Sequence, residues 1–543
     1  MHLSRYLPIT FAALLLGSCG GQPQYHTDVL VVGAGIAGLS AALEAADNGA
    51  DVIVIDMNSV GGGHAVKAGG LALVGTQLQK DKGIEDSAEL AAADLMAWGE
   101  DTDNETVRRY AEQSSTEVYE WLVGLGVEFK LILPTPESSV ARFHFTKGTA
   151  LHVVLPMMRE ALSRPNIRFF WNTAAQQLLL DDTAAVSGIA IENLRTGSHY
   201  DIFAPAVVLA TGGYQSDIDT VLDNWPEGRP KPAQLLIGSG EHATGSGYQL
   251  AASANAHLQR MTKQVTFVNG IPDPRNPQRG LTLENRFGVL INKSGRQFID
   301  AKAPAKHKEL AVFRDAPNGH WMILDSNTLR KTIVRGSAWL TPDTIRTEIL
   351  ENKEIMAAEE SLEAIANAID VPAVNLNNTI DDHNLTAPKP LSKPPYFAIR
   401  MHPLTRKSLG GPATDDDGQV ITPSQDTISG LFAAGELTGV AGINGSFGGS
   451  GTFLGPSVWQ GRIAGRAAAG EAKVRRPDGL SATITRTDKL LIEADGYWHY
   501  KQAHDLINER GTDCQTCHNL TPMAEVASNA DMLARLNTCT QCH

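Results

Sequence analysis

The chain has 543 residues, of which 42% are hydrophobic and 20% are charged, and its formal net charge is −14. It is too long for a single hydrophobic core, so we expect roughly two to four domains. This composition is typical of globular proteins and argues against a disordered chain or a multi-span membrane protein. The negative charge argues against nucleic acid and anionic membrane surfaces as partners.

The first residues have the pattern of an export signal. An apolar run at 6–17 follows Arg5 and is too short to span a bilayer, but it suits the apolar core of a signal peptide. The run leads into Leu16-Gly17-Ser18-Cys19, which resembles a bacterial lipobox. We therefore expect a lipoprotein signal at 1–18, a lipid on Cys19, a tether at 19–26 and a protein anchored on the periplasmic side of a bacterial membrane. An ordinary secretory signal, which would give a soluble periplasmic protein, is the alternative.

Residues 28–56 predict a dinucleotide-binding β-α-β unit. Val29–Val32 is a short apolar run typical of a buried parallel strand, and Gly33, Gly35 and Gly38 follow it at G-x-G-x-x-G spacing. The next segment, 39–48, predicts a helix whose N-terminus favours a pyrophosphate. A second strand at 52–55 ends at Asp56, which stands 23 positions after Gly33, as an acid that binds a ribose hydroxyl does. The fingerprint alone allows NAD or FAD.

Further elements follow in chain order, with glycine clusters between them. Their pattern predicts an amphipathic helix at 104–124, a polar turn at Arg142-Phe143-His144, a helix at 151–162, a meander of strands at 167–180, 186–194 and 201–203, a buried strand at 206–210, and a helix from Thr244-Gly245 to 256. Glycines become sparse from about 263 to 395, which predicts an inserted domain. The alternation of strand and glycine-rich turn returns at 430–455.

These segments, in this order, resemble the FAD-binding fold of fumarate reductase flavoproteins, flavocytochromes c and 3-ketosteroid dehydrogenases. The resemblance covers about 27–470 and implies an α/β fold with FAD as cofactor. It implies a Rossmann-like FAD-binding domain in two parts, 27–262 and 396–473, with an inserted α+β capping domain at 263–395.

By this resemblance, Asp56 binds the adenosine ribose, His64 and Ala65 lie beside the flavin, and Gly435 and Glu436 approach the ribityl chain. Phe453 and Leu454 offer their backbone to the isoalloxazine. The residues expected to contact FAD are Gly33, Ala34, Gly35, Ile36, Ala37, Gly38, Asp56, Met57, Gly62, Gly63, His64, Ala65, Gly69, Gly70, Ala210, Thr211, Gly212, Gly213, Thr244, Gly245, Ala434, Gly435, Glu436, Phe453 and Leu454.

Two C-x-x-C-H motifs near the C-terminus have the signature of c-type haem attachment. Zinc is the rival, since C-x-x-C pairs also form tetrahedral sites, but a histidine directly after both pairs in an exported chain favours haem. We expect a linker at 474–487 and a mostly helical module with two haem c groups at 488–543. The expected attachment residues are Cys514, Cys517, Cys539 and Cys542, the proximal iron ligands are His518 and His543, and the distal ligands are His499 and His504, with Met523 and Met532 as alternatives.

The substrate-binding residues of fumarate reductases are not matched. In that family a capping-domain arginine donates a proton, and histidines with a second arginine hold the carboxylates. The corresponding positions here are Ala305, next to Lys306, then Phe267 and Lys407, and no arginine occurs at 442–452. The segment 451–456 looks more like that of ketosteroid dehydrogenases, which use tyrosines for proton transfer. The candidate catalytic residues are therefore Tyr396, His402, Arg406, Lys407 and Lys306.

The sequence thus predicts an exported flavocytochrome c oxidoreductase. FAD would dehydrogenate or reduce a carbon–carbon bond, α,β to a carbonyl, and the two haems would exchange electrons with a redox partner such as a cytochrome or a quinone-linked carrier. Two alternatives are an electron-transfer relay without substrate chemistry of its own and a fumarate reductase-like reductase of an unsaturated carboxylate. The sequence leaves the direction of electron flow open.

Overall fold

The computed structural model describes residues 24–337 and 339–475. The expected signal peptide, Cys19, both C-x-x-C-H motifs and the distal-ligand candidates lie outside these residues. Within the described chain, no helix is both long and apolar enough to cross a membrane. The same residues contain no group of three or more His, Cys, Asp or Glu side chains that could hold a metal ion.

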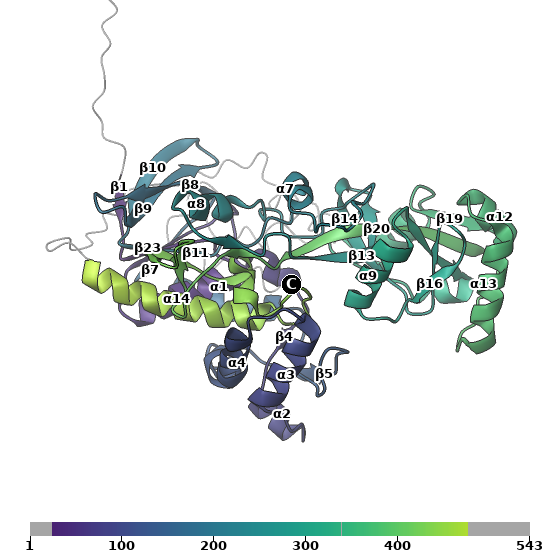
Figure 1. The fold of residues 1–543 in the computed structure, drawn as a ribbon, viewed down its shortest axis with the longest axis horizontal. Helices are drawn as coiled ribbons and strands as arrows, with labels where there is room; N and C mark the ends of the chain where they lie inside the picture. Colours follow the sequence, from purple (N-terminus) through teal and green to yellow (C-terminus); the bar gives the residue numbers. More distant parts are fainter. Residues whose placement is uncertain (1–23, 338, 476–543) are drawn as a thin grey trace, which may run out of the picture.

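A six-stranded, mostly parallel sheet forms the centre of the molecule (Figure 1). The first strands are apolar and β-branched, and they are buried on both faces, as parallel strands usually are. In spatial order the strands are β22 (Gln419–Ile421), β23 (Thr427–Ala433), β11 (Ala206–Leu209), β2 (Val29–Val32), β3 (Val52–Ile55) and β7 (Ile167–Phe170). Only β22 runs antiparallel to its neighbour. The expected meander is wrong at its start, because β7 pairs in parallel with β3 and so belongs to the central sheet.

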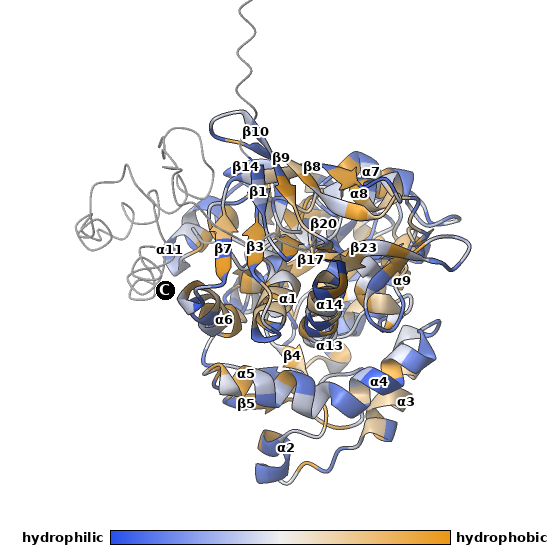
Figure 2. Cartoon of the chain, turned by 90° about the vertical axis from the view of Figure 1, so that its left-hand side faces the viewer, coloured by the Kyte–Doolittle hydropathy of each residue, from blue (hydrophilic) through white to orange (hydrophobic). Residues whose placement is uncertain are grey.

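Alternate side chains of the central strands pack into two separate hydrophobic cores. Val29 and Val31 face one core with α1 (Ile36–Asp47) and α14 (Leu454–Arg475), which pack against each other. Leu30 and Val32 face the other core, under a second sheet. That sheet has the order β1 (Gln24–His26), β10 (Ser198–Phe203), β9 (Val186–Asn193) and β8 (Thr173–Leu180). Figure 2 shows the hydrophobic residues gathered in the interior strands. Helix α1 begins at Ile36, earlier than expected, so its first turn directly follows Gly35.

Smaller elements surround the carboxyl ends of the central strands. Below the sheet in Figure 1 lie mainly α2 (Gln77–Asp81), α3 (Ala88–Gly99), α4 (Asn104–Gln113), a π-helical segment (Ser114–Glu120), α5 (Trp121–Gly124) and the small sheet β4 (Leu71–Ala72), β6 (Phe143–Phe145) and β5 (Leu131–Leu133). The others are a 3₁₀ helix (Gly63–Lys67), α6 (Leu151–Ser163), α7 (Ile218–Asp223), α8 (Ser246–Ser253), the pair β12 (Leu258–Gln259) and β21 (Gly411–Pro412), and a 3₁₀ helix (Gly435–Gly442).

The inserted segment forms a separate sheet with its own cores and extends to one side in Figure 1. Its strands are β16 (Gln297–Asp300), β15 (Val289–Asn292), β17 (His320–Asp325), β20 (Tyr396–Ser408), β13 (Gln264–Asp273), β14 (Asn276–Glu284) and β18 (Ile333–Arg335), with β19 (Met356–Glu359) paired to β20. Its helical segments are α9 (Ala305–Asp315), α10 (Ser326–Leu329), α11 (Pro342–Thr344), a π-helical segment (Ile345–Leu350), α12 (Leu362–Ala368) and α13 (Ala373–Thr386). The long antiparallel pair β13–β20 connects this sheet to the central part, with Gln264 opposite Ser408.

Candidate active site

Two of the three glycines in the turn between β2 and α1 leave no room for a side chain. Gly33 has a φ of 105°, and a Cβ atom there or at Gly38 would overlap main-chain atoms of Ala210 or Gly33, respectively. At Gly35, by contrast, a Cβ would find no atom within 4 Å. Gly35 caps α1 without a side-chain hydrogen bond. The first N–H groups of α1 therefore face open space, as a phosphate site requires.

A second layer of glycines lies beside this turn. The Gly62 N–H donates to the Ala34 carbonyl at 2.7 Å, and Gly62 forms a parallel bridge with Gly35. On the neighbouring strand end, Gly212 has a φ of 80° and also faces open space. The Thr211 hydroxyl next to it is buried without a hydrogen-bond partner in the described chain. Open space and an unsatisfied hydroxyl at one edge of the sheet fit a bound dinucleotide, whose oxygens would serve as acceptors.

Asp56 ends β3 at the same edge. Its carboxylate accepts the Ala34 N–H and the Asn58 N–H, each at 2.7 Å. Burial raises the pKa of Asp56 to about 6, although both hydrogen bonds oppose this shift. The carboxylate thus lies against the first glycine turn, where a ribose hydroxyl would donate to it.

A chain of polar contacts starts at His64, in the 3₁₀ helix Gly63–Lys67. Its Nε2 lies 3.3 Å from Arg406 Nη1, and its Nδ1 lies 3.1 Å from Lys407 Nζ. Lys407 also pairs with Glu436 at 2.8 Å, and the same carboxylate accepts the Ser408 N–H at 3.1 Å. Strand β20 thereby brings two predicted catalytic residues, Arg406 and Lys407, to two predicted FAD residues, His64 and Glu436.

Two further cations face this group. Lys67 and Arg279 both lower the pKa of His64, after burial, Lys407 and Arg406, and that pKa lies well below its usual value. The imidazole of His64 is therefore neutral. Burial, followed by the charges of Arg279 and Arg406, lowers the pKa of Lys67 to about 8. We call Lys67, Arg279, Arg406 and Lys407 the cation cluster.

Acidic and polar groups complete the surroundings of the cation cluster. Glu241 interacts with Lys67 and Arg279, and burial raises the pKa of Glu241. The Ser239 carbonyl accepts a hydrogen bond from Arg279, and the Ser239 hydroxyl lies 3.5 Å from His64 Nδ1. No role was predicted from the sequence for Lys67, Ser239, Glu241 or Arg279. The position of Lys67 between two glycine clusters is the one local signal, whereas Arg279 reaches the cluster through tertiary pairing of β14 with β13 and with Ile237.

The other candidate catalytic residues lie elsewhere. His402 on β20 is paired with Gly270 on β13, and burial, followed by the charge of Arg400, lowers the pKa of His402 to about 4. Tyr396 is at the far end of β20, opposite Asp325. Lys407 is eleven positions further along the chain, which corresponds to roughly 35 Å along a strand. The structure does not bring Tyr396 to the cation cluster.

Lys306 connects the inserted segment with the central part. It lies in the first turn of α9, and its ammonium donates to the Trp98 carbonyl and to Glu100, each at 2.8 Å. It also lies 4.2 Å from the ring centroid of Phe447, in the glycine-rich turn 442–452. Lys263 reaches the same turn and donates to Ser446 at 2.6 Å. Cations from outside the turn thus approach it, although 442–452 contains no arginine.

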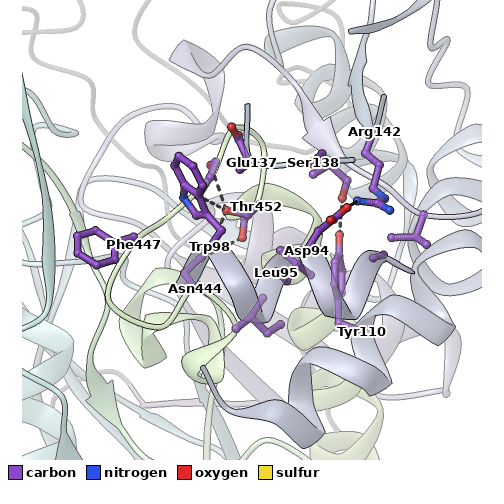
Figure 3. A pocket seen from close by; sticks show the side chains of 15 residues that line it. Asp94, Leu95, Trp98, Tyr110, Glu137, Ser138, Arg142, Asn444, Phe447 and Thr452 are labelled. Carbon is purple, nitrogen blue, oxygen red and sulfur yellow. Dashed lines mark hydrogen bonds and ion pairs between the residues drawn. The ribbon is translucent and has the colours of Figure 1, made fainter. Parts of the chain in front are cut away.

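A small pocket under this turn is shown in Figure 3. Its free volume is about 20 Å³, which is room for about one water molecule. Arg142 and Asp94 point toward one another on one side, and Arg142 also pairs with the fully buried Asp86 at 2.7 Å. On the other side, the Thr452 hydroxyl contacts Asn444. The contacts around this pocket hold the turn that leads into Phe453 and Leu454. The pocket itself is too small to bind a substrate.

We call the glycine-rich turns at 33–38 and 62–63 the glycine cradle. Together with Asp56 and the cation cluster, it defines a dinucleotide-binding oxidoreductase fold. Residues 28–454 match the family described as FAD binding domain, and the chain belongs to this family.

Known proteins similar to this chain include a probable fumarate reductase of Shewanella frigidimarina, which is 29% identical, with 83% of this chain and 76% of the relative covered. A KsdD-like steroid dehydrogenase of Mycobacterium tuberculosis is 27% identical, with 81% of this chain and 95% of the relative covered. Among solved structures, the open conformation of a flavocytochrome c3 fumarate reductase has a TM-score of 0.69 and 27% identity, with 82% of this chain and 79% of that chain covered.

These comparisons confirm the predicted flavoprotein superfamily and the prediction of an FAD-dependent oxidoreductase acting on CH–CH groups. They support FAD as the cofactor. The assignment of individual site residues stays a prediction.

Proposed function

We propose that this protein is an exported flavocytochrome c that reduces or dehydrogenates a carbon–carbon bond α,β to a carbonyl group. The observation that carries the substrate class is the cation cluster around His64, on strands that converge with the glycine cradle. Four cations, Lys67, Arg279, Arg406 and Lys407, outnumber the three carboxylates that act on them, Glu241, Asp273 and Glu436, so the site favours negative charge. We therefore infer that the carbonyl belongs to a carboxylate. One relative is a probable fumarate reductase, and fumarate is an unsaturated carboxylate.

When bound, FAD supplies or accepts a hydride at its N5. The guanidinium groups of Arg406 and Arg279 are assigned to the carboxylate, because planar forks match carboxylate geometry. The same charges stabilise the negative charge that develops on the carbonyl oxygen in the transition state.

A proton must also reach or leave the α-carbon. Lys67 is the group we assign to this step, because its pKa of about 8 is close to the pH at which it would work. His64 stays neutral, so one of its ring nitrogens accepts a hydrogen bond and orients either the Arg406 guanidinium or the Lys407 ammonium.

A matched pair of substrates tests the charge preference. Cinnamate and methyl cinnamate carry the same conjugated double bond, but only cinnamate is an anion. With a reduced one-electron dye as donor, we expect turnover of cinnamate with a kcat/KM at least about tenfold above that of the ester. Arg406→Leu should remove this preference. Equal rates for both compounds in the wild-type protein would contradict the assignment of the cation cluster.

The haems and the export signal are part of the same proposal, supported by the two C-x-x-C-H motifs and the apolar run before Cys19. Protein produced with export and haem maturation should contain one flavin and two haems. Replacing Cys514 and Cys517 with serine should leave one haem, still attached through Cys539 and Cys542. Purified protein without covalently attached haem would refute this part and leave the flavin chemistry standing.

An electron-transfer relay is the second candidate. It is favoured by the absence of an arginine at 442–452 and by Ala305 and Phe267 at positions that bind substrate in fumarate reductases. A screen of unsaturated acids, enones and steroids separates the two functions, because a relay would turn over none of them.

A further inference from the structure

The inserted segment contains a second cleft, which shares no residue with the cation cluster or the glycine cradle. Its volume is about 540 Å³, within the range of small-molecule sites. The cleft lies along β13, β14, β15 and β17 and reaches α9 and the loop after β14. No lining residue in the described chain has a hydrogen bond, ion pair or ring contact to His64, Arg406 or Lys407.

The floor of this cleft is apolar. Leu283, Leu290 and Met322 are buried members of the core of the inserted sheet and lie behind the cleft, whereas Ile333 is 47% exposed and Phe287 is partly exposed. Val268, also buried, adds a branched side chain from β13. A ligand with a hydrocarbon or aromatic body would cover Ile333 and Phe287 and gain the corresponding hydrophobic free energy.

The charged residues of the cleft are predominantly positive. Four cations line it, whereas Glu284 is the one carboxylate among the lining residues; the cations are Arg286, Lys308, Lys331 and Lys389. Glu284 is also paired with Arg335 at 3.3 Å. An anionic group is therefore the complementary partner for the polar part of the cleft.

Lys308 is the least exposed of the four cations. It is partly buried on α9, and its ammonium makes one long hydrogen bond, 3.4 Å to the Ala301 carbonyl, and no ion pair in the described chain. An ammonium has three donors, so this group has room for a further acceptor. Burial lowers the pKa of Lys308, against the weaker opposing charges of Glu284 and Asp300. A bound anion would offset this cost of burial.

The rim of the cleft is held in place. The ring of Phe287 is faced by the Lys389 ammonium at 4.5 Å and by the Arg286 guanidinium at 5.8 Å. The Asn285 side chain donates to the Thr328 carbonyl at 2.8 Å and accepts the Phe287 N–H at 3.0 Å. These contacts fix the loop that carries Phe287 and Arg286, and a preformed wall reduces the ordering cost of binding.

We propose that this cleft binds a small organic anion with an apolar body, such as a medium-chain or aromatic carboxylate. The Lys308 ammonium binds the carboxylate, Lys389 and Lys331 attract it from the rim, and the apolar body lies on Ile333 and Phe287. This is a second site, and it does not depend on the chemistry proposed for the flavin side.

Calorimetry on the full-length, FAD-loaded protein tests this site with decanoate as the probe and 1-decanol as its neutral match. We expect one decanoate to bind per chain and decanol to bind at least about tenfold more weakly, because a charge-assisted hydrogen bond is lost.

Lys308→Met should weaken decanoate binding by at least about tenfold, whereas Lys308→Arg, which keeps the charge, should restore most of it. Lys293→Met, at an exposed lysine of the same segment, should leave it unchanged.

Lys389→Glu provides a variant at an exposed position, where misfolding is not expected, and it should weaken decanoate binding severalfold. Unchanged FAD content in every variant shows that the fold is intact.

The proposal is overturned if decanoate does not saturate a site, if decanol binds equally well, or if Lys308→Met binds decanoate like the wild type. Decanoate binding that perturbs the flavin spectrum and is lost in Arg406→Leu would place the anion at the flavin side and would also overturn it. Turnover of cinnamate bears only on the flavin side, so the two proposals fail separately.

Discussion

The cofactor side of this active site is formed mainly by main-chain atoms, and the substrate side is formed mainly by side chains. The cofactor side is main chain: Gly33, Gly35 and Gly38 stand where a Cβ would overlap backbone or fill the phosphate space. The substrate side is formed by long charged side chains, such as Lys67 and Arg406, from segments far apart in the chain. Main-chain geometry allows few substitutions, whereas side chains can be exchanged without a change of fold. The cofactor is therefore common to the family, and the charged residues are the place to look for this protein's specificity.

The largest expected effect follows from filling the cofactor side. In Gly38→Val the side chain would collide with the Gly33 carbonyl, so the turn must open and α1 must move away from β2. We expect loss of bound FAD and a lower melting temperature, measured by flavin absorbance and thermal unfolding. Gly470→Ala is the matched control, because a Cβ at Gly470 meets no atom within 4 Å. Full FAD content in Gly38→Val would refute the assignment of this glycine turn to FAD binding.

The substrate side should respond in activity and not in cofactor content. Arg406→Leu removes a buried guanidinium that contacts His64 and the Gly238 carbonyl, and we expect kcat/KM to fall by about 100-fold or more while FAD stays bound. Tyr396→Phe, at the other end of the same strand, should change kcat/KM by less than about threefold. Steady-state kinetics with cinnamate measures both. The reverse ranking would return the catalytic role to Tyr396.

The pH dependence of kcat/KM should reflect the ionisation of the Lys67 ammonium. Its pKa is lowered to about 8, so the ammonium is charged below pH 8 and loses its charge above. Arg279 and Arg406 contribute to this lowering, and Glu241 and Asp273 oppose it. We expect the kcat/KM for cinnamate to decline above about pH 8. In Lys67→Arg the side chain stays charged but does not release its proton, so kcat should fall strongly while KM no longer changes with pH. A flat profile in the wild type, or the same decline in Lys67→Arg, would contradict this assignment.

The smallest effect is expected at Lys306. Its partner Glu100 is 60% exposed, so this ion pair contributes less than about 1 kcal/mol. Lys306→Met should raise KM by a few-fold through a looser contact between α9 and Trp98, with kcat nearly unchanged. Lys302→Met, in the exposed turn before α9, is the control. A loss of kcat by about 100-fold would instead make Lys306 the proton donor.

The sequence predicted the cofactor side well because its determinants are local. Within 28–56, strand, turn, helix, strand and acid follow one another, and the structure reproduces them with a shift of three residues at the start of α1. The placement of β7 was wrong, because a short apolar strand does not reveal which sheet it joins.

The substrate side was predicted only in part because its members meet through tertiary structure. Arg406 and Lys407 were found from their position before a glycine-rich turn, but Arg279 lies on a strand whose approach no local pattern indicates. Tyr396 shows the opposite case. It is close to Lys407 in sequence, yet an extended strand separates them by roughly 35 Å.

Anaerobic mixing of the fully reduced protein with cinnamate or methyl cinnamate tests the central claim most directly. The recovery of the oxidised flavin absorbance gives the rate of the half-reaction without any assumption about the physiological direction of electron flow. We predict recovery with cinnamate at least about tenfold faster than with the ester, and no such difference in Arg406→Leu. Equal recovery with both compounds, or a difference that persists in Arg406→Leu, would contradict a substrate side organised around the cation cluster.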